Sequence, residues 1–218
     1  IWCSGTHDIP FKPNMAHDLK VKQLHSVDYK GAHQFPGNEA ILVVGSGQSG
    51  VQIADDLARN NKSVWLATGN SAGSPRLHRG DHFFDWVKRM GINKMTNEMR
   101  LQRPDAERLR YSKPPHVGSR HAISYFSLQR QGVTIAGRFR GKHNNTLEFE
   151  DDRLDNVKKS IESYEGYTTR IEAWISSQPA ETREIFQAQE NKKEKEWEVD
   201  SELLSLPGPK NLPERSSE

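Results

Sequence analysis

Three glycines at positions 45, 47 and 50 have the spacing G-x-G-x-x-G, between an apolar run and a segment of helical periodicity. In such a turn the first glycine allows a sharp bend, the second admits a diphosphate close to the backbone, and the third lets the helix pack tightly. The start of a helix also offers N–H donors and a partial positive charge, which favour phosphate. The turn therefore predicts a dinucleotide site, although glycine used for geometry alone is an open alternative. The predicted site residues of the turn are Gly45, Ser46, Gly47, Gln48, Ser49 and Gly50.

The elements that must position this turn are a strand, a helix and a second strand. Residues 40–44 form a short continuous apolar run, which is typical of a strand buried on both faces. Residues 51–59 repeat apolar side chains at helical spacing, residues 60–61 are two asparagines that end the helix, and residues 63–67 form a second strand. A strand, helix and strand within about thirty residues predict a parallel unit. The expected fold class is α/β, a Rossmann-like doubly wound parallel sheet with a helical C-terminal extension.

The end of the second strand indicates which dinucleotide is bound. Sites for NAD or FAD usually carry Asp or Glu there, to bind the ribose hydroxyls. Residues 66–70 contain no carboxylate, Thr68 offers a hydroxyl, and Arg76 and Arg79 follow in the next loop. Because arginine suits phosphate by its charge and its planar fork, we expect NADP(H) rather than NAD(H), with all three residues in contact with it. Solvated loop cations are the alternative for the two arginines.

The rest of the chain is predicted to alternate short elements and then to become helical. Charged residues dominate the last predicted helix, and an Asn-Asn pair marks a hairpin turn. The expected elements are helices at 81–90, 122–131, 154–176 and 180–204, a strand at 133–136 and a hairpin over 139–149. The expected units are a linker at 1–37, a nucleotide-binding domain at 38–150, a helical extension at 151–205 and a tail at 206–218.

Composition excludes several classes of function. The chain has 218 residues, a net charge of +2 and no apolar run near the 18 residues or so of a membrane span. The balanced charge argues against nucleic acid as a partner, and a single cysteine excludes an internal disulfide framework and favours a cytoplasmic protein. His78 and His82 lack a metal-binding pattern, so we expect no metal.

The stretch QLHSVDYKGAHQFPGNEAILVVGSGQSGVQIADDL resembles the NADPH-binding domain of flavin-containing monooxygenases. It is most similar to flavoproteins labelled as transport-associated oxidoreductases, and IWCSGTHDIPFKP resembles the segment in which such enzymes leave their FAD domain. The family signature is F-x-G-x-x-x-H-x-x-x-[YF]. His25 and Tyr29 match its last two positions, whereas Leu19 and Val21 replace Phe and Gly. The resemblance implies that His25 and Tyr29 lie at the junction of the FAD and NADPH domains; a hydrogen-bonded loop histidine is the alternative for His25.

The resemblance also implies an activity. Such enzymes pass a hydride from NADPH to FAD and then insert oxygen into a small substrate, so the chain is expected to be the NADPH-binding portion of a monooxygenase-type oxidoreductase. Only one glycine motif is present, and it matches the NADPH motif, so FAD is expected in a further domain of the full-length protein. No catalytic residue is assigned in this chain. The alternatives are an NADP(H)-sensing module linked to ion transport and an inactive partial-gene product.

Overall fold

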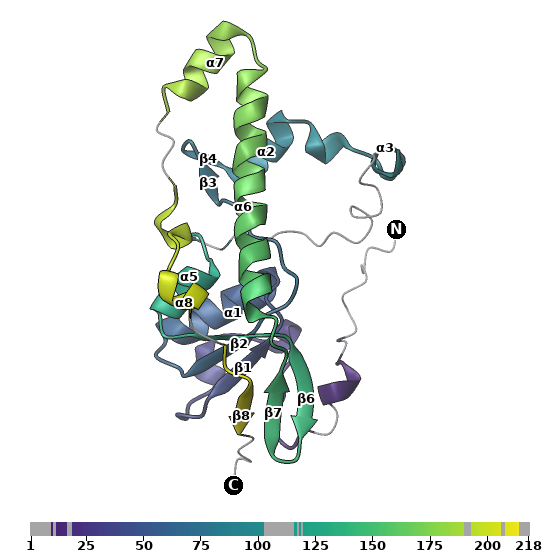
Figure 1. Ribbon diagram of the computed structural model, residues 1–218, viewed down its shortest axis with the longest axis vertical. Coiled ribbons are helices and arrows are strands. Elements are labelled where there is room, and N and C mark those ends of the chain that lie inside the picture. Colours follow the sequence, from purple (N-terminus) through teal and green to yellow (C-terminus); the bar gives the residue numbers. More distant parts are fainter. Residues whose placement is uncertain are drawn as a thin grey trace.

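A three-stranded parallel sheet lies at the lower end of the molecule in Figure 1, which shows a computed structural model. Strand β1 (Ile41–Val44) pairs with β2 (Val64–Ala67), which pairs with β5 (Thr134–Ala136). Helix α1 (Gln48–Arg59) connects β1 to β2 and ends at Asn60, as the sequence predicted. The residues described by the structure are 10, 12–16, 19–102, 116, 118, 120–189, 193–205 and 208–213.

The two faces of this sheet are covered differently. Val64 and Leu66 of β2 are buried in one core with α1 and with α5 (Tyr125–Arg130). Trp65, which points to the opposite face, stacks on Phe149 with ring centroids 6.0 Å apart. In the described part of the chain, helices thus cover one face and a β-hairpin covers the other. A mixed α/β fold with a parallel sheet is confirmed, and a Rossmann-like arrangement is consistent with it.

The hairpin that covers the second face was predicted correctly. It consists of β6 (Phe139–His143) and β7 (Thr146–Phe149), and Asn144 in its turn has a φ of 55°. The third strand of this antiparallel sheet, β8 (Asn211–Pro213), pairs with β7. These residues lie in the predicted tail, where no strand was expected, and they extend the edge that β7 offers.

Helix α6 (Arg153–Ser176) runs from the sheet through the upper half of the molecule, beside β3 (Leu77–His78), β4 (Asp81–His82) and α2 (Phe83–Arg89) (Figure 1). At its lower end Val157 belongs to the core of the sheet. At its upper end Ile171 and Ile175 pack with Trp86 of α2 in a second core. Within the described ranges, no helix is both long enough and apolar enough to cross a membrane.

The predicted continuous helix at 180–204 is wrong in the described part. The segment contains α7 (Ala180–Gln187), the 3₁₀ turn η5 (Lys195–Trp197) and α8 (Ser201–Ser205). Glu194 has extended backbone (φ −61°, ψ 131°), and its carboxylate accepts hydrogen bonds from the backbone N–H groups of Arg76 and Leu77. The remaining elements are η1 (Asn14–Ala16), η2 (Ser26–Asp28), η3 (Ala32–Gln34), η4 (Ile92–Lys94) and α3 (Asn97–Leu101).

Candidate functional site

The structure accounts differently for glycine at each of the three glycine positions of the turn. Gly45 has a φ of +98°, which an L side chain rarely adopts. A Cβ at Gly50 would lie 1.8 Å from the carbonyl oxygen of Gly45, so only glycine allows α1 to pack this closely. Gly47 has extended backbone (φ −70°, ψ −175°), and a Cβ there would meet nothing within 4 Å among the described atoms. The fold of the chain therefore explains glycine at 45 and 50 but not at 47.

The N-terminus of α1 has no side-chain cap at Gly47 within the part of the chain that the structure describes. Gly47 is the N-cap residue and has no side chain with which to cap the helix, and the first turn carries no acidic residue. The first helical hydrogen bond is donated by the N–H of Val51 to the carbonyl of Gly47, at 3.1 Å. Gly47 and Ser49 are both exposed. The partial positive charge of the helix is thus available to an anion from outside the chain.

Ser46 is buried and ties the turn to two other elements. Its Oγ accepts a hydrogen bond from the Tyr125 hydroxyl of α5 at 2.7 Å and another from the N–H of Gly69 at 3.1 Å. Gly69 follows the end of β2, so Ser46 connects the turn with the place where the ribose is expected. The side chain predicted as a cofactor ligand therefore also positions the turn. Sequence analysis missed Tyr125, which had no local signal beyond its place in an apolar helix.

The predicted ligands Gln48 and Thr68 bind to the protein itself. The side-chain amides of Gln48 and Gln52 both donate to the carbonyl oxygen of Gly118. The Thr68 hydroxyl donates to the carbonyl of Ala136 at 2.7 Å and accepts a hydrogen bond from Asn156 at 3.2 Å. Since only 2% of Thr68 is exposed, its hydroxyl fastens β2 to β5 and α6 in this conformation.

Arg79 is not brought to the turn. Its guanidinium binds both carboxylate oxygens of Glu172, with Nε and Nη2 at 2.8 and 2.9 Å. It also donates to the backbone carbonyls of Phe186, near the end of α7, and of Gln189, just after it. Glu172 lies 16 residues beyond Asn156, the partner of Thr68, so the two contacts are about 24 Å apart along α6. Arg76 is half-buried, and its own backbone N–H is bound to Glu194.

His25 and Tyr29 fasten the segment before the sheet onto α1. The His25 Nδ1 accepts a hydrogen bond from the N–H of Val27 at 3.3 Å and caps η2. The Tyr29 hydroxyl donates to Oδ2 of Asp56 at 2.6 Å, and burial together with this hydrogen bond raises the pKa of the phenol. His25 is hydrogen-bonded within its loop, and the place of His25 and Tyr29 at a junction with an FAD domain stays a prediction.

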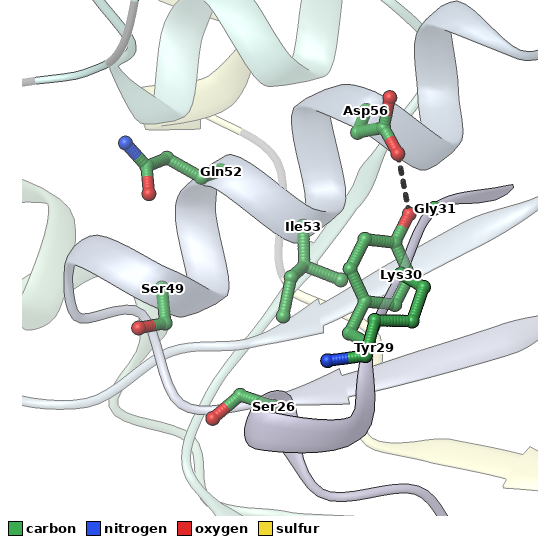
Figure 2. Close-up of a pocket in the computed structure, with 8 residues that line it drawn as sticks. All are labelled: Ser26, Tyr29, Lys30, Gly31, Ser49, Gln52, Ile53 and Asp56. Carbon is green, nitrogen blue, oxygen red and sulfur yellow. Dashed lines mark hydrogen bonds between the residues drawn. The ribbon is translucent and has the colours of Figure 1, made fainter.

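An open cavity of about 410 Å³ lies between this segment and the exposed face of α1. Figure 2 shows Ser49 and Gln52 on the helix opposite Ser26 and Lys30. Because Ser49 belongs to both the turn and the cavity, a molecule bound at the turn would find space next to it. The residues that line the cavity are Ser26, Tyr29, Lys30, Gly31, Ser49, Gln52, Ile53 and Asp56.

Histidine does not build a metal centre in the part of the chain that the structure describes, where no three His, Cys, Asp or Glu side chains gather around one point. The Nε2 of His78 pairs with Glu172 at 2.6 Å. His116 is fully buried against Trp197, and this burial lowers its pKa to about 4, so the ring is neutral. Its backbone binds residues 72 and 74, and it therefore supports the loop after β2.

Comparison with known proteins identifies relatives of the first part of the chain. Residues 1–91 match the family described as flavin-binding monooxygenase-like. An uncharacterized oxidoreductase, CzcO, of Bacillus velezensis is 34% identical over 96 residues, which are 42% of this chain and 27% of the relative. CzcO of Bacillus subtilis is 32% identical over 92 residues, 41% of this chain and 26% of the relative. The flavin-containing monooxygenase iboF of Amanita muscaria is 30% identical over 103 residues, 41% of this chain and 18% of the relative.

These matches confirm the predicted resemblance over residues 1–91, which include the glycine turn. The matching family is described as flavin-binding, and the relatives are named as oxidoreductases and a monooxygenase. The matched segments span only about a quarter of the length of the two bacterial relatives. The predicted nucleotide-binding domain extends to residue 150, and its part beyond residue 91 stays a prediction.

Proposed function

We propose that the turn from Gly45 to Gly50 binds the diphosphate of NADPH, and that the chain is the NADPH-binding portion of a flavin-dependent, monooxygenase-type oxidoreductase. The observation that carries this proposal is Gly47. Its backbone dihedrals are accessible to any residue, and a Cβ there would meet no described atom within 4 Å. The position nevertheless carries none of the better capping residues Ser, Thr, Asp and Asn. A glycine that neither the turn geometry nor the packing requires is explained by a ligand that approaches the backbone closely.

In this proposal each residue of the turn has a separate task. Gly45 reverses the chain after β1, Gly50 brings the start of α1 onto the turn, and Gly47 leaves room for the diphosphate. The exposed hydroxyl of Ser49 is placed to donate a hydrogen bond, and the helix N-terminus supplies the favourable charge. Bound NADPH supplies a hydride for the flavin, and FAD is proposed to be held by a further domain of the full-length protein. The contribution of this chain is to bind and orient the nucleotide.

The preference for NADPH over NADH is part of the same proposal. Residues 66–70 carry no carboxylate that would repel a 2′-phosphate, and the sheet with its covering helices is proposed to be one Rossmann-like half of the nucleotide domain. Arg76 is the predicted arginine proposed to meet the 2′-phosphate, because the guanidinium of Arg79 is held by Glu172. Small-molecule substrate and oxygen chemistry are proposed for the full-length protein by its resemblance to the family.

Titration of the full chain with NADPH and NADH, followed by calorimetry, tests the proposal. We expect saturable binding with NADPH the tighter ligand, and we expect Gly47→Glu to weaken it at least a hundredfold while the circular dichroism spectrum is retained. The matched control is Gly166→Glu on α6, because Gly166 also has nothing within 4 Å of its Cβ position among the described atoms and lies outside the turn and the end of β2. Unchanged NADPH binding by Gly47→Glu would overturn the proposal.

A further inference from the structure

We propose that Tyr125 is a positioning residue for the nucleotide, which acts through Ser46 to fix the glycine turn relative to the end of β2. This inference rests on the proposed function, because it assigns the means by which that same turn is kept in a binding geometry. Tyr125 touches no nucleotide in this proposal. It is 79 residues away from Ser46 in the sequence, and only the fold brings the two together.

The hydrogen bonds around Ser46 fix the position of its side-chain hydroxyl. A serine hydroxyl has two acceptor lone pairs and one proton. The Tyr125 hydroxyl and the N–H of Gly69 both donate to Ser46 Oγ, at 2.7 and 3.1 Å. Both acceptor positions are therefore taken, and Ser46 keeps a proton to donate. Because Ser46 lies between Gly45 and Gly47, holding its side chain also holds the backbone on which the diphosphate is proposed to rest.

A turn of this kind needs an external support. Glycine loses more conformational freedom on ordering than any other residue, and three of the six residues of the turn are glycine. A turn that is already ordered binds more tightly, because the ligand does not have to order it. Tyr125 supplies the support from outside the strand and helix that flank the turn.

Tyr125 is itself held firmly. It is the first residue of α5, and its neighbour Ser124 caps that helix through a reciprocal pair of hydrogen bonds with Ser127. The Ser124 hydroxyl also binds the backbone carbonyl of Glu196. The ring of Tyr125 packs on His116, and only 1% of the residue is exposed. Burial raises the pKa of the phenol to about 12, so the hydroxyl keeps its proton at every pH at which the protein is expected to work.

The experiment compares four forms of the full chain: wild type, Tyr125→Phe, Ser46→Ala and the double variant. Dissociation constants are measured for NADPH, NADH and ADP-ribose, which share the diphosphate, and thermal unfolding is followed for each form. We expect Tyr125→Phe to weaken all three ligands by the same factor, about 3- to 10-fold. In the Ser46→Ala background the same change is expected to have no effect, because the partner of the hydroxyl is already absent. Tyr164→Phe, a change in another buried tyrosine, controls for lost packing and is expected to leave binding unchanged.

Each outcome of these measurements supports or overturns the positioning role of Tyr125. If wild type binds the nucleotides and Tyr125→Phe binds them equally well, the positioning role is overturned and the proposed function stands. If Tyr125→Phe weakens binding equally with and without Ser46, the effect does not pass through Ser46 and the inference is again overturned. If wild type binds none of the three ligands, the proposed function fails as well, so the two failures are distinguishable.

Discussion

The carbonyl oxygen of Gly45 lies so close to Gly50 that a Cβ on residue 50 would approach it to 1.8 Å. The obstructing atom belongs to the backbone, so it cannot rotate away as the end of a flexible side chain would. A Cβ on Gly47, three residues earlier, would meet no described atom within 4 Å. Two glycines of one motif thus serve different purposes, one in packing the chain and one in leaving space beside it.

A stability measurement separates these two purposes. We expect Gly50→Ala to lower the free energy of unfolding by about 1–3 kcal/mol, because the added methyl group forces α1 away from the turn. Gly47→Ala is expected to change it by about 0.5 kcal/mol or less, as for a surface substitution. Urea unfolding of both variants beside wild type provides the measurement. Equal losses at the two positions would show that Gly47 also is fixed by packing.

The two arginines after β2 are expected to behave differently on substitution. Arg79→Gln should lower the free energy of unfolding by about 1–3 kcal/mol. The side chain of Glu172 is only one-third exposed, and the substitution removes the bidentate partner of its carboxylate. It should leave the dissociation constants of NADPH and NADH unchanged. Arg76→Gln should instead reduce the preference for NADPH, about fivefold. Titration of both variants with both nucleotides checks this. A reduced preference in Arg79→Gln would restore Arg79 as a nucleotide ligand.

The strand, helix and strand around the turn were predictable because each depends on local pattern. The apolar run, the helical spacing and the glycines lie within thirty residues or so, and their bounds agree with β1, α1 and β2 to within a few residues. The exposed place of Gly47 and Ser49 follows from the same motif. The hairpin of β6 and β7 was also predictable, because its turn contains an Asn-Asn pair.

The contacts that support the site were not predictable, because they join residues far apart in the sequence. Tyr125 reaches Ser46 across 79 residues, and Glu194 reaches Arg76 across 118. Neither pair leaves a periodic signal, and a charged run such as that around Glu194 is usually a solvated helix surface. The same reason explains why Arg79 was expected at the nucleotide, since its partner Glu172 is 93 residues away.

Asp55 on α1 is expected to stabilise the fold more than its neighbour Asp56. Only 5% of Asp55 is exposed, and it accepts hydrogen bonds from Gln131, His121 and Arg59. Burial alone would raise its pKa, but these hydrogen bonds outweigh burial and lower it. Asp55→Asn should therefore cost about 2–3 kcal/mol of unfolding free energy at pH 7.

The pH dependence of this effect has a definite sign. A carboxyl whose folded pKa is depressed contributes stability above its unfolded pKa and loses it as the pH falls through the folded pKa. The difference between wild type and Asp55→Asn should therefore shrink below pH 4. Asp56→Asn is the matched control and should cost less, because the Asp56 carboxylate accepts hydrogen bonds from Tyr29 and Asn60 only among the described residues. Urea unfolding between pH 3 and 7 measures both, and an equal cost at the two positions would contradict the assigned network.

Glu194 is expected to make the attachment of the C-terminal segment sensitive to pH in the opposite sense. Burial raises the pKa of its carboxyl to about 7, although the N–H groups of Arg76 and Leu77 and the charge of Arg76 oppose the shift. The nearby Glu196 raises it further, and Lys193 and Lys195 line the same cavity. Because the folded pKa exceeds the unfolded one, the contribution is fully present below about pH 4.5 and is lost as the pH rises towards 7.

The variant that checks this behaviour is Glu194→Gln, which keeps the shape of the side chain and removes its titration. Relative to this variant, wild type should lose unfolding free energy between pH 5 and 8, on the order of 2 kcal/mol. Hydrogen exchange of the Arg76 and Leu77 amides, corrected for intrinsic rates, should show faster opening at pH 8 than at pH 5 in wild type only. Parallel pH profiles for the two proteins would mean that the Glu194 carboxyl does not titrate in this contact, and that the segment is held by the buried ring of Trp197 against Tyr164 instead.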